Sequence, residues 1–235
     1  PNQEAPAQNG KRRTRLIALG VAVLVGDFLY TRSFQMMIRA GNLRVMRALA
    51  DAANTLAEGE VKQMVNAHDP TVDEKRYFEV IERKTACLFE AGAKMAAAIA
   101  DCSEKDEAAV REYALALGNA FQIVDDMLDY TGVSNDIGKN LGADLREGKV
   151  TLPLLYARLH TSEENRALID AAIRSGNGDF DKISSIVIES QAIARCKQRA
   201  EQELERGKVA LLQLSPSIFR DSLLQLLFYT VCRDR

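Results

Sequence analysis

The chain has 235 residues and a formal net charge of -2, so its charge gives no reason to expect nucleic acid or an anionic membrane as a partner. Hydrophobic residues make up 47% and charged residues 27% of the sequence, which are ordinary values for a globular protein with a sizeable core. Its four cysteines lie far apart and form no CxxC pair. That spacing argues against a zinc site or a disulfide framework and favours a reducing, cytoplasmic location.

The first 14 residues, PNQEAPAQNGKRRT, are polar and include an early proline and a glycine. We therefore predict a disordered leader over residues 1–14 and one helical domain over residues 15–235. The longest apolar run follows, from Leu16 to Val25, and has about half of the roughly 20 residues that a membrane-spanning helix needs. A signal peptide would require a cleavage site with small residues after this run, and the sequence has none there. We expect a buried helix here and no stable membrane insertion.

Apolar residues recur at intervals of three and four along the rest of the chain, and no alternating segment indicates a strand. The pattern predicts an all-α fold. Ser103, Thr161 and Ser215 are each followed by residues typical of a helix start, so we expect them to be N-caps. The expected helices cover residues 16–40, 43–67, 74–101, 104–131, 150–160, 163–175, 181–189 and 191–232, the last broken near Pro216. The long early helices are typical of a bundle that surrounds a deep cavity.

Three aspartates stand in an otherwise apolar helical stretch, FQIVDDMLDY, which begins at Phe121. Asp125 and Asp129 are about one helical turn apart and project from the same face, with Asp126 beside them. Carboxylates this close repel one another, and a divalent cation removes that repulsion. Mg²⁺ prefers oxygen ligands shared with substrate phosphates, so the pattern indicates a diphosphate site bridged by Mg²⁺ or, alternatively, Mn²⁺. The other interpretation is a solvated acidic patch at a helix end.

The segment GKNLGADLREGK, which begins at Gly138, favours the binding site over the solvated patch. Its lysines, Lys139 and Lys149, supply point charges suited to phosphate. Its glycines allow a loop to fold over a ligand and to present backbone amides. Because the neighbours of Asp125 and Asp126 are apolar, the aspartates do not belong to a solvated face by composition. We expect a functional loop between the aspartate helix and Val150.

These residues resemble a known family. FQIVDDMLDY, with GKNLGADLREGKVTLPLLYA behind it, is similar to the second aspartate-rich motif of the trans-prenyl (polyprenyl) diphosphate synthases. VGDFLYTRSFQMM from Val25, EGEVKQ from Glu58 and ERKTACLFEAG from Glu82 resemble further motifs of that family, in the same order. The resemblance covers the chain from about Val21 to its end. It is nearest to the long-chain, octaprenyl-type bacterial enzymes that make the side chains of quinones such as ubiquinone.

The resemblance implies an isoprenoid-synthase-type helical bundle around a central cavity, and a homodimer. It also implies a prenyltransferase of isoprenoid biosynthesis, which uses Mg²⁺ to condense isopentenyl diphosphate with an allylic diphosphate, farnesyl or longer. The implied metal ligands are Asp125, Asp126 and, directly or through water, Asp129. The implied diphosphate-binding residues are Lys84, Lys139 and Lys149, and Thr85 and Gln122 would place their oxygens near the allylic carbocation.

The EGEVKQ motif has no assigned role at this point, because glutamates two residues apart, Glu58 and Glu60, face different sides of a helix. The family also has a first aspartate-rich motif upstream of VGDF, and nothing before Val21 matches it. We therefore expect the synthase domain to be N-terminally incomplete and the chain as given to be weakly active or inactive. Two alternatives stay open, a noncatalytic regulatory subunit of a heteromeric prenyl synthase and a class I terpene cyclase. The intact aspartate cluster argues against the former, and the KTA and GK…EGK segments argue against the latter.

Overall fold

The computed structural model describes residues 5–131 and 141–232, and every regular element in these ranges is a helix. The all-α prediction is confirmed. The chain divides into two compact units, Pro1–Arg47 and Ala48–Arg235. The predicted division into a leader and one domain stays a prediction.

The N-terminal unit contains α1 (Ala5–Ala40) and the start of α2 (Leu43–Asn66). Helix α1 begins before the expected residue 16, because a proline is tolerated in the first helical turn and the alanine, glutamine, lysine and arginine residues that follow favour helix. The predicted burial of the apolar run was wrong, since every large apolar side chain from Ile17 to Tyr30 is more than half exposed. The apolar residues lie all round this helix rather than on one face, so their pattern does not select a buried side.

One described segment of α1, Ile17–Ala40, is long and apolar enough to cross a membrane by length and composition alone. It has 24 residues and a mean hydropathy of 1.5, and it is longer than the run seen in the sequence because Gly26 and Asp27 do not end the helix. A single such segment near an N-terminus is weak evidence, since core helices of soluble proteins and signal sequences meet the same criteria.

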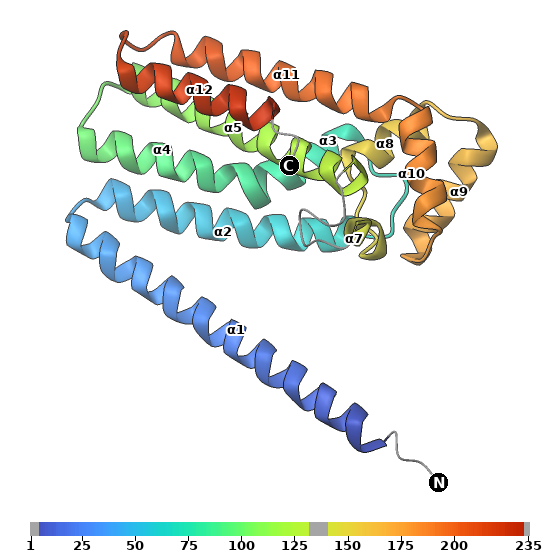
Figure 1. Ribbon diagram of the computed structural model, residues 1–235. Coiled ribbons are helices and arrows are strands. Elements are labelled where there is room, and N and C mark those ends of the chain that lie inside the picture. The colour runs from blue at the N-terminus through green and yellow to red at the C-terminus, as the bar shows by residue number, and fades with distance from the viewer. Residues whose placement is uncertain (1–4, 132–140, 233–235) are drawn as a thin grey trace. The chain divides into compact units, whose positions relative to one another are not determined.

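The second unit is built around a long central helix, α5, which packs between α4 and α11. Helix α12 packs on both α5 and α11, and Figure 1 shows these four helices side by side. The shorter helices α8, α9 and α10 pack on one another. The elements of this unit after α2 are α3 (Glu74–Ile81), the π-helix η1 (Glu82–Ala86), α4 (Cys87–Ala100), α5 (Glu104–Thr131), α7 (Ala143–Arg146), α8 (Leu152–Leu159), α9 (Glu163–Ser175), α10 (Phe180–Glu189), α11 (Ala192–Leu211) and α12 (Ile218–Cys232).

Apart from the early start of α1, most helix bounds agree with the prediction to within a few residues, but two further elements differ. The helix expected over residues 74–101 is interrupted by η1, where the Cys87 N–H donates to the Glu82 carbonyl five residues earlier. The segment expected to be a loop after α5 contains the single helical turn α7. Among the predicted N-caps, Ser103 is confirmed, because its hydroxyl accepts from the Asp106 amide.

The other two predicted N-caps were wrong by one or two residues. Ser162 caps α9 instead of Thr161, and the hydroxyl of Ser217, rather than that of Ser215, accepts from a first-turn amide of α12. In both cases a second residue with a hydroxyl group follows closely. The N-cap is the residue directly before the first helical residue, and the sequence did not fix that position.

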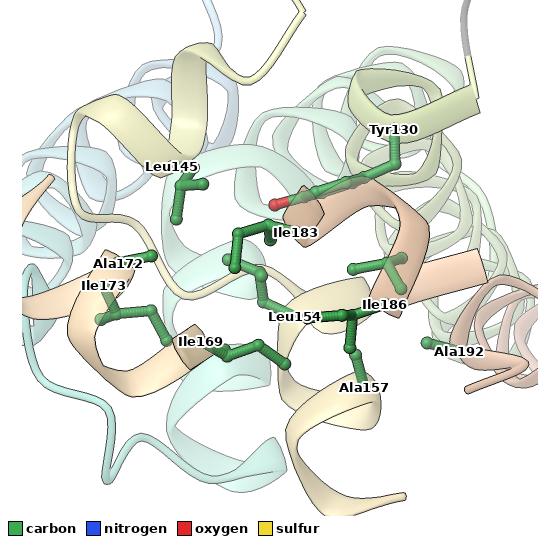
Figure 2. Close-up of a cluster of buried hydrophobic side chains, with 11 residues drawn as sticks. Tyr130, Leu145, Leu154, Ala157, Ile169, Ala172, Ile173, Ile183, Ile186 and Ala192 are labelled. Atoms are coloured by element: carbon green, nitrogen blue, oxygen red, sulfur yellow. The ribbon is translucent and has the colours of Figure 1, made fainter. Parts of the chain in front are cut away.

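A buried apolar cluster fixes α7 beside the C-terminal end of α5. Figure 2 shows Tyr130 of α5 and Leu145 of α7 pointing toward side chains of α8, α9 and α10, among them Leu154 and Ile183. Leu145 is only 2% exposed. Because Leu145 lies in the middle of GADLREGK, this packing holds that segment against the aspartate end of α5.

Candidate active site

The second unit contains a cavity of about 670 Å³. Its walls come from the C-terminal part of α2, from α3, η1 and α5, and from the segment 141–151. Every predicted site residue that the structure describes lines this cavity, namely Lys84, Thr85, Gln122, Asp125, Asp126, Asp129 and Lys149. The remaining predicted residue, Lys139, lies outside the described residues.

A continuous hydrogen-bond network crosses one wall of the cavity. The Thr85 hydroxyl donates to Gln122 Oε1 at 2.8 Å, and Gln122 Nε2 donates to Asp126 Oδ1 at 2.8 Å. The Tyr77 hydroxyl donates to the other carboxylate oxygen, Asp126 Oδ2, at 2.7 Å. Both ends of the Gln122 amide are therefore fixed, and so is the orientation of Thr85.

Burial dominates the electrostatics of Asp126, which is 4% exposed. Desolvation raises the pKa of Asp126 to about 7, although the hydrogen bonds from Gln122 and Tyr77 act in the opposite direction. The nearby carboxylates of Asp144 and Asp125 raise it further. Burial, followed by the Asp126 charge, holds the pKa of Tyr77 well above its ordinary value, so Tyr77 keeps its proton and remains a donor.

The Asp129 side chain of α5 lies at the N-terminal end of the short helix α7. Its Oδ1 accepts from the Gly142 amide at 3.1 Å, and Gly142 has a positive φ of 74°, a conformation that glycine adopts without strain. Its Oδ2 is buried and has no hydrogen-bond partner among the described residues. Burial, and then the charge of Asp144, raises the pKa of Asp129, while the amides of the α7 turn oppose that rise.

The predicted anion-binding lysine of the segment after α7, Lys149, is held by two carboxylates. Its Nζ lies 2.8 Å from Asp144 Oδ1 and 2.7 Å from Glu147 Oε2. Burial lowers the pKa of Lys149, but these two ion pairs outweigh that effect and raise it above its ordinary value. Lys149 is therefore cationic at every physiological pH.

Lys84 also lines the cavity, from its position in η1. Its Nζ donates to Gln63 Oε1 at 2.7 Å and forms an ion pair with Glu60 Oε2 at 3.1 Å. Both partners belong to the EGEVKQ motif of α2, which had no assigned role from the sequence. Gln63 itself lines the cavity.

Among the cavity residues that sequence reasoning did not select, Tyr77 and Asp144 contact the predicted site residues directly. Tyr77 precedes Lys84 by seven residues, which is about two helical turns and a signal that they share a face. Asp144 lies within the quoted GADLREGK segment, but its carboxylate was not separated from the surrounding loop. Its importance follows from its position between Asp129 and Lys149, which only the folded chain shows.

Among residues 5–131 and 141–232, no three histidine, cysteine, aspartate or glutamate side chains are arranged to hold a metal ion by themselves. The ligand set of three aspartates therefore stays a prediction. Two observations fit a cation that completes its coordination with ligand oxygens. These are the buried, unpartnered oxygen of Asp129 and the raised pKa of the buried Asp126, since a nearby positive charge relieves both.

The family model described as polyprenyl synthetase matches residues 12–189. Octaprenyl diphosphate synthase of Escherichia coli (strain K12) is 42% identical over 236 residues, which is 99% of this chain and 73% of that protein.

Two solved structures are also similar. Polyprenyl synthase from Caulobacter crescentus CB15, complexed with calcium and isoprenyl diphosphate, has a TM-score of 0.88 at 36% identity and is matched over 92% of this chain and 67% of that chain. A decaprenyl diphosphate synthase from Rhodobacter capsulatus has a TM-score of 0.83 at 38% identity, over 91% of this chain and 66% of that one. This chain therefore spans about two thirds to three quarters of the length of these relatives. From the sequence match and the shared all-α fold, the chain belongs to the polyprenyl synthetase family of prenyl-transferring enzymes.

Proposed function

We propose that the chain catalyses the Mg²⁺-dependent condensation of isopentenyl diphosphate with an allylic diphosphate, farnesyl or longer, to give a long-chain polyprenyl diphosphate for a quinone such as ubiquinone. One observation carries this proposal. A single cavity combines acidic and cationic side chains with an apolar wall that includes Val80, Ile81 and Leu128. Such a lining suits a ligand with a charged diphosphate head and a hydrocarbon tail. The Caulobacter crescentus relative, which holds calcium and isoprenyl diphosphate, supports the same ligand chemistry.

The acidic residues would hold the divalent ion, and the lysines would bind the diphosphate directly. The residues for the metal are Asp125, Asp126 and Asp129, and those for the diphosphate are Lys84, Lys149 and, outside the described residues, Lys139. When bound, Mg²⁺ supplies positive charge against the diphosphate oxygens. The lysines stabilise the negative charge that grows on the diphosphate as the allylic C–O bond breaks, so their effect is largest in the transition state.

Thr85 and Gln122 have a separate role in the proposal, at the carbon end of the breaking bond. The Thr85 hydrogen points to Gln122 Oε1, so the hydroxyl oxygen is left to present lone pairs toward positive charge in the cavity. The double bond of isopentenyl diphosphate then attacks the allylic cation, and a proton leaves. The Gln122 amide is locked by Asp126 and Thr85 and needs no reorganisation during this step.

We further propose that the protein works as a cytoplasmic homodimer. Exposed apolar side chains support an association of this kind, since covering them is favourable in water. They include Leu24 and Phe28 of α1 and Phe219 and Tyr229 of α12, each more than half exposed.

Incubation with radiolabelled isopentenyl diphosphate and farnesyl diphosphate, followed by chain-length analysis of the products, tests the activity. We expect labelled polyprenyl products that form slowly with Mg²⁺, in line with the weak activity expected from the sequence, and that disappear with excess chelator. The variant Asp125→Ala should form them at least roughly 10²-fold more slowly, because the cation that stabilises transition-state charge loses one of its ligands. The matched variant Asp181→Ala, at an exposed position on α10, should retain the wild-type rate.

The ratio between these two variants is the test, whatever the absolute rate of the wild-type chain. Equal rates for Asp125→Ala and Asp181→Ala would contradict the proposal. So would a folded protein that neither forms labelled products nor binds farnesyl diphosphate.

A further inference from the structure

The EGEVKQ segment of α2 lies along the π-helix η1 and contacts it at successive positions. Glu58 Oε2 forms an ion pair with Arg83 Nη1 at 2.7 Å. Glu60 and Gln63 both bind Lys84 Nζ, as described above. Three side chains of EGEVKQ thus contact Arg83 or Lys84, which lie 21 to 25 positions later in the sequence. The backbone of Gly59, in the same motif, lies close to both of these residues.

Gly59 explains how the two helices approach closely enough for these contacts. A Cβ atom at Gly59 would lie 2.7 Å from the Lys84 nitrogen and 2.9 Å from the Arg83 carbonyl carbon. Both are backbone atoms and cannot move aside alone. On the other side, a Cβ at Gly118 of α5 would lie 2.6 Å from Ala86 Cα. The π-helix therefore packs closely against two glycines, Gly59 on α2 and Gly118 on α5.

We propose that Glu60 and Gln63 are positioning residues, which hold the Lys84 ammonium in place to receive the anionic head of a diphosphate. This inference rests on the proposed function for the ligand, but its geometry stands by itself. A lysine side chain is long and flexible, and fixing it on binding costs side-chain entropy. The ammonium has three donors, and Glu60 and Gln63 take two of them. The third donor is left to bind the ligand, with the side chain already ordered.

The position of Glu60 makes this role distinguishable from a purely electrostatic one. Glu60 does not line the cavity, so its replacement leaves the cavity walls intact. If Glu60 acted only as a negative charge near an anion site, removing that charge would strengthen anion binding whatever residue replaced it. If it positions Lys84, the hydrogen-bond acceptor matters as well as the charge.

Glu60→Gln and Glu60→Met separate these two roles, because both are uncharged and of similar length and only glutamine keeps an acceptor. The measurement is calorimetric titration of inorganic pyrophosphate in the presence of Mg²⁺. We expect Glu60→Met to bind roughly 2- to 10-fold more weakly than Glu60→Gln, the range that corresponds to one ordinary hydrogen bond. Gln63→Met should lose affinity relative to the wild type to a similar extent. Equal affinities for Glu60→Met and Glu60→Gln would overturn the proposal.

The ion pair between Lys62 and Glu79 provides a matched control. It also joins α2 to α3, with a separation of 2.6 Å between Lys62 Nζ and Glu79 Oε2, and neither residue lines the cavity. The variants Glu79→Gln and Glu79→Met should bind pyrophosphate equally and as the wild type does. A difference between them as large as that between the Glu60 variants would show that the effect is not specific to Lys84, and this would also overturn the proposal.

A measurement without any ligand separates this inference from the proposed function. Brief acetylation by acetic anhydride, read by mass spectrometry, reports the access to each lysine amine. We expect Lys84 to react more slowly than the exposed Lys105 in the wild type and to react faster in Glu60→Met and Gln63→Met. If the wild type fails to bind pyrophosphate but these rates change as expected, the proposed function fails and the positioning contact stands. Unchanged Lys84 rates in both variants would contradict the contact itself.

Discussion

Asp126 is a buried carboxylate with both oxygens accepting hydrogen bonds, from Tyr77 and from Gln122. Burial raises its pKa to about 7 despite these donors. Without a cation nearby, this side chain is neutral below that pH and is charged, at a cost in free energy, above it. The site thus contains a carboxylate whose preferred neighbour at neutral pH is a positive charge.

The first prediction concerns the pH dependence of stability in the absence of divalent ions. Because the pKa of Asp126 is raised in the folded state above its usual value of 3.8, the folded protein binds the proton more tightly than the unfolded chain. Its contribution to the free energy of unfolding is therefore lost as the pH rises from about 4 to 7. The loss is on the order of 4 kcal/mol, at about 1.36 kcal/mol per pKa unit.

Urea unfolding of the wild type and of Asp126→Asn, in chelator and at several pH values, measures this loss. The variant carries no titrating group at this position, so contributions from other groups cancel in the difference. We expect the wild type to lose stability relative to Asp126→Asn between about pH 4 and 7 and to change little above that range. A difference that stays constant over this range would contradict the assignment.

The second prediction concerns the donor of the buried hydrogen bond. Tyr77→Phe removes the hydroxyl that donates to Asp126 Oδ2 at 2.7 Å and leaves that buried oxygen short of a donor. Urea unfolding at pH 8 should show a loss of about 1–3 kcal/mol. Tyr229→Phe, at a position that is 71% exposed, should change the free energy of unfolding by less than about 0.5 kcal/mol. Equal effects of the two variants would contradict the role of Tyr77.

Much of the candidate site could be predicted from residue types and spacing. The aspartates of FQIVDDMLDY and the lysine and threonine of ERKTA were expected at one site, and they line one cavity. The spacing of Tyr77 from Lys84 gave a weak signal for its position, but its contact with Asp126 could not be predicted, because that contact spans 49 residues of sequence and periodicity does not identify long-range partners. The role of EGEVKQ was missed for the same reason. The spacing of Glu58 and Glu60 shows that they do not face the same ligand. Nothing in the motif indicates that its partner is Lys84 on another helix.

At the scale of elements, the π-helix η1 determines how Lys84 and Thr85 face the cavity. One extra residue in this turn changes the register of the helix, and such turns are frequent at functional sites. Close packing against α2 and α5 through Gly59 and Gly118 holds the turn in place. An uninterrupted helix over residues 74–101 would direct the same side chains differently.

The third prediction tests this packing with one substitution at two helical glycines. Alanine normally stabilises a helix interior by up to about 1 kcal/mol relative to glycine. Gly92→Ala on α4, where a Cβ meets nothing within 4 Å, should show that gain. Gly59→Ala should instead lose about 1–2 kcal/mol, because forcing a methyl group against the η1 backbone costs more than the helix gains. Thermal unfolding measures both, and a gain in stability for Gly59→Ala would show that η1 does not depend on this contact.

Helix existence and approximate extent could be predicted from apolar periodicity, and the irregular elements could not. The turn at η1 packs against glycines from two other helices, and no local pattern shows that packing. The turn α7 depends on Leu145 packing into a distant apolar cluster and on Asp129 accepting from the Gly142 amide. Both are tertiary effects that override local sequence preference.

At the scale of the whole molecule, α1 exposes large apolar side chains, and this exposure is the basis of a fourth prediction. Leu24 is 68% exposed and Phe28 is 65% exposed. We expect sedimentation at micromolar concentration to show a dimer or a larger assembly, because covering such side chains is favourable in water. Leu24→Glu should shift the distribution toward smaller species. A monodisperse monomer of the wild type would contradict this prediction.

In the site that we propose, one cavity binds an allylic diphosphate through a divalent ion held by Asp125, Asp126 and Asp129. Calorimetric titration of farnesyl diphosphate into the protein, with Mg²⁺ and separately with excess chelator, tests it most directly. We predict binding with Mg²⁺ that is lost in chelator and is strongly weakened by Asp125→Ala, because the clustered carboxylates repel a diphosphate unless a cation bridges them. Equal affinity for farnesyl diphosphate with Mg²⁺ and with chelator would contradict the claim.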